Sequence, residues 1–380
     1  NGLAASPRAE AGDAAASGMR WRLRHGRELN GTVGILHSEM PLALPHGRSI
    51  SLDHIRFEWP AGTARSFEDY RAGNVLDGLL VLKDGRIVFE QYYDGFGPRD
   101  MHNWASVSKS VVGVVAERLA RSGKIDLEAP AGHYVPDLAA TPFGAATLRQ
   151  NLDMYVSVAY PQNLPPDRGL FAPAGLAPAP AGAPASIHDF LRIVRQGEAE
   201  NGSQFYYQNG SAEAVTWALE RATGKPLSRL VSEEVWGPMG ASDDGYYLVD
   251  RQRSAFASGG LSSALRDMAR FGVFVRRQDV GAAQPMLSWN VARTAPGRGF
   301  RYRSFWWLDE RGAFGLGRFG QRLAIIPDKG LVVVQFGAYQ DERPRPISGD
   351  DSAAGPKGGD LRDGEAFQAL AHAIADQVEF

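Results

Sequence analysis

The sequence contains no cysteine. Disulfide bonds, thiol nucleophiles and thiolate metal ligands are therefore excluded, although this absence leaves the cellular compartment open. Basic charge is not in excess either, because 41 lysine and arginine residues face 43 aspartate and glutamate residues, for a formal net charge of −2. A chain without a broad basic surface is a poor candidate for binding nucleic acid or an anionic membrane. No apolar run approaches the length of a membrane span.

Several common catalytic patterns are missing as well. No Gly-x-Ser-x-Gly sequence is present, so an α/β-hydrolase would have no nucleophile. None of the eight histidines belongs to a His-Glu-x-x-His or similar pair, and no phosphate-binding loop or dinucleotide fingerprint occurs. We therefore expect a protein that works without a metal ion or other cofactor.

The bulk composition is that of an ordinary globular protein. The 380 residues are 44% hydrophobic and 22% charged, enough for a large core and two structural regions. The chain begins with Asn1 rather than methionine, and its first eighteen residues are small and polar, so we expect them to be disordered. A removed export signal and a trimmed sequence both fit this start. A periplasmic or secreted location is slightly favoured over a cytoplasmic one.

The stretch from His102 to Ser122 has the most informative pattern in the chain. Its apolar residues recur at helical spacing with charged residues between them, at Val111, Val114, Val115 and Leu119. Gly123 stands just past the last of these, where helices commonly end. Ser106 begins the predicted helix and Lys109 follows one turn later. A spacing of three puts both side chains on one helical face, close enough to touch.

Such a pair can supply a nucleophile and its base. A serine hydroxyl is inert at neutral pH, and a lysine amine becomes a base only when burial and nearby positive charge lower its pKa. The first turn of a buried helix supplies both conditions. Of the six lysines only Lys109 has a serine three residues before it, and it lies on the apolar side of the helix. The alternative is that Ser106 caps the helix and Lys109 lies on the surface.

Strand signals occur near both ends of the chain. Leu79–Leu82 and Ile87–Phe89 flank an Asp-Gly turn, which is a strong hairpin signal. Short apolar runs return at residues 305–308, 314–316, 323–326 and 331–336. Between the two groups lie helical pieces and proline-rich connections. The long segment Leu164–Pro184 is expected to be a lid or a surface insertion.

These patterns predict an α+β fold in which an antiparallel sheet is flanked by helices and a mainly helical region is inserted. Residues 1–60 are expected to be an irregular N-terminal extension that wraps around the rest. Residues 61–130 and 270–380 would together form a discontinuous α/β region, and residues 131–269 the helical region. The Gly/Asp-rich segment Ser348–Gly364 is expected to be a loop before a final amphipathic helix.

A second candidate motif, Tyr207-Gln-Asn209, opens a predicted helix after a loop. On an extended turn the two side chains face one cavity. A phenol near a lysine can pass protons to a leaving group, and an amide can hold the substrate and orient the lysine. The alternative is that Tyr207 packs in the core and Asn209 caps the helix.

A third candidate motif, Gly317-Arg318-Phe319-Gly320-Gln321, leads into the predicted strand at residues 323–326. Glycines at a strand edge let a substrate backbone approach closely, and Arg318 could bind a carboxylate. The alternative is a glycine turn with a solvated arginine, which is favoured when this motif is taken alone.

In this order and spacing, the three motifs resemble those of serine hydrolases with a β-lactamase/DD-peptidase fold. The flanking sequences Gly123-Lys-Ile-Asp-Leu127 and Gly259-Gly-Leu-Ser-Ser263 are also similar. Within that superfamily the chain looks most like the class C β-lactamase-like branch, which includes 6-aminohexanoate-dimer hydrolases and related esterases. The resemblance covers roughly residues 70–380.

The resemblance implies a role for each motif. Ser106 would be the nucleophile that forms an acyl-enzyme, and Lys109 its general base. Tyr207 would protonate the leaving group or help activate the deacylating water, and Asn209 would hold the substrate. The oxyanion hole would combine the backbone N–H of Ser106 with a second one, which we place at Arg322.

The third motif departs from the family pattern, which usually reads Lys-Thr-Gly or His-x-Gly. Here Arg318-Phe319-Gly320 stands in that place, which argues against β-lactam hydrolysis and peptidoglycan peptidase activity. Arg318 and Gly320 are expected to contact the substrate, and Phe319 favours a more apolar acyl or amide compound. Tyr160 is a further candidate for the pocket wall, although packing in a loop is the favoured alternative.

The sequence therefore predicts a serine hydrolase that cleaves an amide or ester through an acyl-enzyme at Ser106. The substrate would be a small molecule, either a 6-aminohexanoate-oligomer-type amide or a short-chain ester. The protein is expected to be a monomer or a homodimer. Two alternatives stay open at this point: a penicillin-binding or β-lactamase-type enzyme, and a catalytically silent binding module of the same fold.

Overall fold

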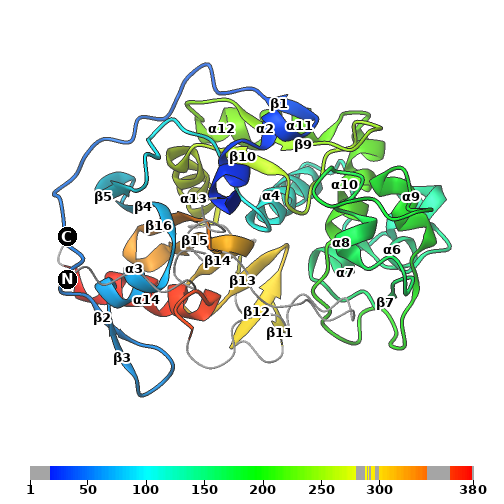
Figure 1. Ribbon diagram of the computed structural model, residues 1–380. Helices are drawn as coiled ribbons and strands as arrows, with labels where there is room; N and C mark the ends of the chain where they lie inside the picture. Colours follow the sequence, from blue (N-terminus) through cyan, green and yellow to red (C-terminus); the bar gives the residue numbers. More distant parts are fainter. Residues whose placement is uncertain are drawn as a thin grey trace, which may run out of the picture.

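The computed structural model describes residues 18–279, 287–288, 290, 292–295, 299–339 and 360–378. Its centre is an eight-stranded sheet in which every neighbouring pair is antiparallel (Figure 1). The strand order is β11(Arg293–Ala295), β12(Phe300–Arg303), β13(Trp306–Leu308), β14(Ala313–Gly317), β15(Gln321–Ile326), β16(Leu331–Gly337), β4(Leu76–Lys83), β5(Arg86–Tyr92). The α+β fold with an antiparallel sheet is thereby confirmed.

The predicted hairpin is the pair β4 and β5. Asp84 and Gly85 connect the strands with positive φ angles of 48° and 78°. Two positive φ values are what a tight hairpin turn needs to match the twist of its strands, and Asp-Gly adopts them readily. β16 pairs with the other side of β4, so strands from the two ends of the chain are neighbours in one sheet.

The other strands in the described residues form three smaller sheets. The first has the order β1(Thr32–Ile35), β9(Gly245–Leu248), β10(Leu261–Ser263), β6(His102–Asn103), and the others pair β2(Arg56–Glu58) with β3(Ala64–Ser66) and β7(Val158–Ala159) with β8(Arg195–Gln196). The sequence pattern did not indicate β1 or β2 within the irregular extension, nor β9 and β10 within the helical region. These strands have three or four residues, too few for an alternating pattern to stand out.

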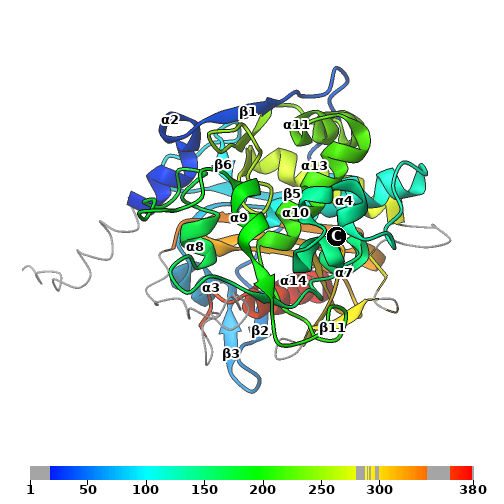
Figure 2. The same cartoon turned by 90° about the vertical axis from the view of Figure 1, so that its right-hand side faces the viewer.

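The described residues include four long helices: α4(Val107–Arg121), α10(Gly210–Thr223), α13(Leu265–Asp279) and α14(Gly364–Gln377). α13 and α14 lie on opposite faces of the large sheet (Figures 1 and 2). The shorter helices are α2(Gly26–Leu29), α3(Phe67–Gly73), α5(Ala131–Tyr134), α6(Pro142–Ala145), α7(Leu148–Leu152), α8(Pro166–Gly169), α9(Ile187–Ile193), α11(Leu227–Val231) and α12(Gly237–Met239). Single turns occur at η1(Pro136–Leu138), η2(Ser232–Trp236), η4(Arg318–Gly320) and η5(Pro327–Lys329).

Helix α4 is the element on which both halves of the molecule converge. It packs against β13, β14 and β15 on one side and against α10 on the other (Figure 1). Its valines are buried as the sequence pattern predicted. Gly113 makes the close approach possible, because a Cβ atom there would lie 2.0 Å from the Ser304 carbonyl oxygen. The start of α4 is thereby held at the junction between the sheet and the helical region.

The division at residues 60, 130 and 270 stays a prediction. The expected disorder of the first eighteen residues falls almost entirely outside the described residues, as does most of the predicted loop Ser348–Gly364. Within the described part of the chain, no helix is long and apolar enough to cross a membrane. The same described residues contain no group of three or more His, Cys, Asp or Glu side chains arranged to hold a metal ion.

Candidate active site

The candidate nucleophile, Ser106, lies immediately before α4 and follows a constrained turn. Ala105 has a φ of 45°, in the left-handed region that non-glycine residues seldom adopt. Asn103 holds this turn, since its Oδ1 accepts the Ala105 N–H at 2.8 Å and its Nδ2 donates to the carbonyls of Gly259 and Leu261. The Ser106 side chain caps no backbone N–H of the helix, so the helix-cap alternative has no support.

Lys109 is the partner of Ser106. Lys109 Nζ lies 2.9 Å from Ser106 Oγ, and it donates to the Ser258 carbonyl at 2.7 Å. Lys109 is completely buried, so the surface-lysine alternative is wrong. Its Nζ also lies 5.2 Å from the centre of the Tyr207 ring. The structure therefore brings Ser106, Lys109 and Tyr207 together from α4 and from the loop before α10.

A buried carboxyl supports the backbone beside Lys109. Glu213, in the first turn of α10, accepts the N–H of Ala257 at 3.1 Å and the N–H of Ser258 at 2.9 Å. Complete burial raises the pKa of Glu213 to about 7, against the opposing effect of its hydrogen bonds to Ser258 and Ala257 and of the nearby Lys109. Glu213 and Ser258 were not among the candidate residues predicted from the sequence. Glu213 does have a signal, because it is an acidic residue on an apolar helix, and the same argument singled out Lys109.

The second motif occupies the entrance to α10. Asn209 precedes the helix and makes no side-chain cap, so the capping alternative is not observed. Tyr207 is buried, stacks on Trp307 with ring centres 5.5 Å apart, and meets the edge of Tyr302 at 6.1 Å. Tyr207 thus does pack in an aromatic group, and that group presents the tyrosine to Lys109.

The middle of the third motif, Arg318–Gly320, forms the turn between β14 and β15, while Gly317 ends β14 and Gln321 begins β15. Phe319 has a φ of 64° within the turn η4. Gly317 allows the turn to approach the start of α4, because a Cβ atom there would lie 2.7 Å from the Trp104 carbonyl oxygen. Gly320 has a φ of 95°, which favours glycine. The glycine-turn alternative was correct about the local structure.

Arg322 follows this turn on β15, where it pairs with Leu316. Its side chain is buried and donates to the carbonyls of Gly317, Gln321 and Arg362. The guanidinium therefore links the turn η4 to the segment before α14. The role of the Arg322 backbone N–H in an oxyanion hole stays a prediction.

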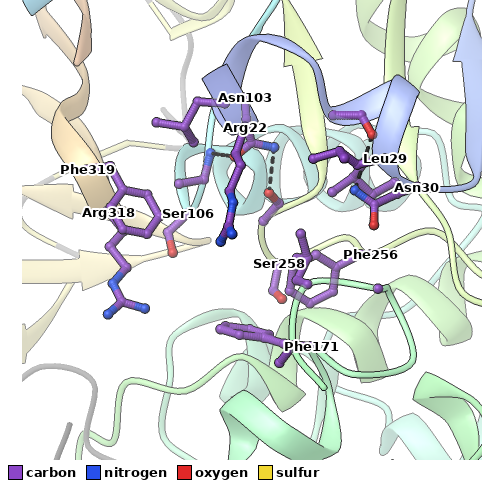
Figure 3. A pocket seen from close by; sticks show the side chains of 18 of the residues that line it. Arg22, Leu29, Asn30, Asn103, Ser106, Phe171, Phe256, Ser258, Arg318 and Phe319 are labelled. Carbon is purple, nitrogen blue, oxygen red and sulfur yellow. Dashed lines mark hydrogen bonds between the residues drawn. The ribbon is translucent and has the colours of Figure 1, made fainter. Parts of the chain in front are cut away.

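A cavity of about 590 Å³ opens at Ser106. Its walls come from six separate parts of the chain (Figure 3). They are the N-terminal segment with Met19, Arg22, Leu23, Gly26, Leu29 and Asn30; the turn before α4 with Asn103, Ala105 and Ser106; the loop with Phe171, Gly175, Leu176, Ala177 and Pro178; Asn209 before α10; the segment with Leu248, Phe256, Ser258 and Gly259; and the turn with Arg318 and Phe319. A cavity of this size accommodates a small molecule.

Two expected contact residues are not among those that line this cavity. Tyr160 donates to the Gln208 side chain at 2.8 Å and stacks on Phe190, which agrees with the packing alternative. Gly320 faces Gly337 and Tyr339. The Leu164–Pro184 segment, by contrast, supplies one wall of the cavity through Phe171 and its neighbours, a position that composition alone did not indicate.

Comparisons with known proteins agree with this arrangement. The family model described as Beta-lactamase matches residues 64–347, which is more than half of the chain. The chain belongs to the beta-lactamase family. It is accordingly a serine hydrolase of β-lactamase-like fold, an enzyme of the amidase and esterase type, and the family prediction is confirmed.

Individual relatives are consistent with that assignment. The chain is 29% identical over 349 residues to a 6-aminohexanoate-dimer hydrolase from Paenarthrobacter ureafaciens, covering 85% of this chain and 86% of the relative. A solved structure of a proposed 6-aminohexanoate-dimer hydrolase from Bacillus anthracis matches with a TM-score of 0.79 and 27% identity, covering 94% and 93% of the two chains. A family VIII carboxylesterase shares the fold, with a TM-score of 0.55 and 16% identity over 76% and 93% of the two chains.

Proposed function

We propose that this enzyme hydrolyses a small linear amide or ester through an acyl-enzyme at Ser106. The observation that carries the proposal is the 2.9 Å contact between Ser106 Oγ and the completely buried Lys109 Nζ. Burial disfavours the charged form of an amine, and a neutral amine can take the hydroxyl proton. Lys109 is therefore the proposed general base.

In the first half-reaction Lys109 takes the proton of Ser106 while Oγ attacks the scissile carbonyl carbon. The oxygen of the tetrahedral intermediate would be stabilised by the backbone N–H of Ser106 and by that of Arg322. The bond to the leaving group then breaks, and the leaving amine or alcohol receives a proton from Tyr207. Lys109 returns its proton to Tyr207, so that both side chains are neutral again before the second half-reaction. Asn209, which lines the cavity beside Ser106, would hold the substrate.

In the second half-reaction a water molecule takes the place of the leaving group. The amine of Lys109, helped by Tyr207, removes a proton from this water as it attacks the acyl carbon. Ser106 Oγ leaves and recovers a proton, so the free acid and the starting enzyme are formed. The same three side chains serve both steps with their roles reversed.

The proposed substrates are a 6-aminohexanoate-oligomer-type amide and a short-chain ester. The similarity to two 6-aminohexanoate-dimer hydrolases supports the amide. The cavity supports acyl compounds of moderate length, because Phe171, Phe256 and Phe319 line it. We propose a monomer or a homodimer as the functional unit, which sedimentation analysis tests directly. The periplasmic or secreted location stays a prediction.

Intact-mass analysis tests this function. Wild type and Ser106→Ala are incubated in parallel with p-nitrophenyl butyrate, the 6-aminohexanoate linear dimer and penicillin G, and product release is followed. Turnover of the ester or the dimer by wild type alone is the expected result. A stable adduct with penicillin G and no turnover of the others would favour a penicillin-binding protein. No adduct and no turnover in folded protein would favour a binding module.

A further inference from the structure

The described ionisable side chains that line the cavity all carry positive charge. Within the described part of the chain, the ionisable side chains that line it are two arginines, Arg22 and Arg318. No aspartate, glutamate or lysine among the described residues lines it; its other polar side chains are asparagines and serines. A linear dimer with a free ammonium group would find two guanidinium groups here and no carboxylate. A substrate carboxylate would find a complementary charge.

The two arginines come from distant parts of the sequence. Arg318 belongs to the turn between β14 and β15, inside the region that the family model matches. Arg22 belongs to the helical residues 18–24, outside that region. Figure 3 shows both side chains extending into the space in front of Ser106. The N-terminal segment therefore adds a charged wall to the family's site.

The helix that carries Arg22 is fixed by a buried ion pair. Arg20 Nε and Arg24 Nη2 lie 2.6 and 2.9 Å from Oδ1 of Asp77, whose side chain is completely buried on β4. His102 Nε2 lies 3.0 Å from the other carboxylate oxygen of Asp77. Removing one partner of such a buried network is costly, so the helix is held firmly against the sheet.

This anchoring determines where Arg22 lies. Residues four apart share a helical face, so Arg20 and Arg24 both face Asp77, while the residue midway between them lies on the opposite side of the helix. Arg22 is exposed, and it has no ion-pair or hydrogen-bond partner among the described residues. An arginine held in place at a cavity, with its guanidinium available, is suited to bind an anionic group of the substrate.

We infer that Arg22, together with Arg318, selects substrates that carry a carboxylate over neutral and cationic ones. The inference rests on the proposed acyl-transfer function and names its substrate class. The class is an amide or ester whose acyl or leaving portion ends in a carboxylate: a dicarboxylic acid half-ester or an N-acylated amino acid. Arg22 is then a specificity-determining residue supplied by the N-terminal segment.

Matched pairs of substrates test this selection. p-Nitrophenyl hydrogen adipate, with a carboxylate on the acyl portion, is compared with neutral p-nitrophenyl hexanoate and with the cationic p-nitrophenyl ester of 6-aminohexanoate, each corrected for spontaneous hydrolysis. N-butyryl-6-aminohexanoate and its methyl amide compare a carboxylate and a neutral group on the leaving portion. The readout is the anionic-to-neutral ratio of kcat/KM, measured in wild type, Arg22→Gln and Arg27→Gln.

Arg27 is the matched control, because it lies on the same segment but packs over the Tyr246 ring and does not line the cavity. The ratio is expected to exceed one in wild type for at least one pair, and to fall about five- to tenfold in Arg22→Gln, a loss typical of a charged hydrogen bond. Added salt should lower the wild-type ratio. Preference for the cationic ester, or an equal ratio in Arg22→Gln and Arg27→Gln, would overturn the inference.

The failure of the inference can be distinguished from failure of the proposed function. If turnover disappears in Ser106→Ala but the charge ratio is near one, the acyl-transfer function stands and the charge selection is wrong. If no substrate is turned over, calorimetric binding of monomethyl adipate and of dimethyl adipate to Ser106→Ala still measures the selection. Equal affinities for the two compounds would then contradict it.

Discussion

Glu213 and Lys109 are coupled through the backbone of Ser258. The carboxyl of Glu213 accepts the Ser258 N–H at 2.9 Å, and the Ser258 carbonyl accepts a hydrogen bond from Lys109 Nζ at 2.7 Å. The residue that orients the proposed base is therefore itself held by a buried acid from a different helix. Glu213 is in this account a positioning residue, because it acts on Lys109 and not on the substrate.

The Glu213→Gln variant tests this coupling. Glutamine cannot accept both backbone N–H groups, so the Ser258 carbonyl loses its support, and we expect kcat to fall about tenfold. Loss of the carboxylate also removes a charge that favours the protonated lysine. The acidic limb of the kcat/KM profile should therefore move to lower pH. The measurement is a full pH profile of ester hydrolysis.

Glu220 provides the control for this variant. It lies on the same helix, burial raises its pKa to about 7 as well, and it accepts the Leu227 N–H at 2.8 Å. Glu220→Gln removes a similar buried acid that makes no contact with the Lys109 region. If both variants shift the profile equally, or if neither does, Glu213 has no specific effect on the base.

The two buried acids also predict how stability depends on pH. Each folded-state pKa is raised from 4.5 to about 7, so the folded protein binds protons more tightly than the unfolded chain between these values. Their contribution is fully present below about pH 4.5 and is lost as the pH rises to 7. Each group should lower the free energy of unfolding by about 1 kcal/mol per pH unit within that window.

Urea denaturation at several pH values between 5 and 8 measures this slope. The double variant Glu213→Gln/Glu220→Gln should show a flatter dependence than wild type in this range. Carboxyls whose pKa is lowered affect the free energy of unfolding only at lower pH. Asp77 is an example: burial raises its pKa, but interactions with His102 and Arg24 outweigh that effect. Burial lowers the pKa of His188 to about 4, which acts in the opposite direction, so the comparison with the double variant decides: an equal pH dependence of the two proteins would contradict the prediction.

Tyr207→Phe separates proton transfer from packing. The phenylalanine ring can keep the stacking on Trp307 and the edge contact with Tyr302, so the fold and the thermal midpoint should change little. Loss of the hydroxyl should lower kcat about 100-fold, the usual contribution of a general acid or base. Steady-state kinetics with an amide substrate, whose leaving group needs a proton most, gives the clearest result. Wild-type kcat for the amide would rule out the proton-transfer role.

Gly113→Ala tests the close approach that holds α4 in place. The added Cβ atom would overlap the Ser304 carbonyl oxygen, a rigid backbone atom. We expect the free energy of unfolding to fall by about 3 kcal/mol, because the helix must move away from the sheet. Gly34→Ala is the control, since no atom lies within 4 Å of a Cβ atom built there. Equal stabilities of the two variants by urea denaturation would show that α4 can shift at little cost.

The parts of this molecule that could be predicted from the sequence are those with local signals. The helix after Ser106 follows from its valine spacing, and the β4–β5 hairpin follows from Asp84-Gly85. The proximity of Ser106 and Lys109 follows from their spacing on one helix. The turn at Phe319 could be predicted only as an alternative, because Gly317 approaches Trp104 and Gly320 approaches Gly337, and both contacts join residues that are distant in sequence.

The rest depends on contacts between residues distant in sequence. Arg22 lies at the cavity because Arg20 and Arg24 meet Asp77, more than fifty residues away, and no local pattern records that pairing. Glu213 supports Ser258 across forty-five residues. Tyr160 was only a candidate for the pocket wall, and its hydrogen bond to Gln208 and its stacking on Phe190 agree with the packing that the sequence favoured.

The most direct test of the central claim is the rate at which a fluorophosphonate labels Ser106, with the modified residue identified by peptide mapping. We compare wild type with Lys109→Met, which keeps a buried side chain of similar length, and with Lys124→Met, which removes an exposed lysine paired with Glu234. We expect the probe to label Ser106. The labelling rate should be about 100-fold lower in Lys109→Met than in wild type and unchanged in Lys124→Met. Labelling at another residue, or an equal rate in Lys109→Met and wild type, would contradict the central claim.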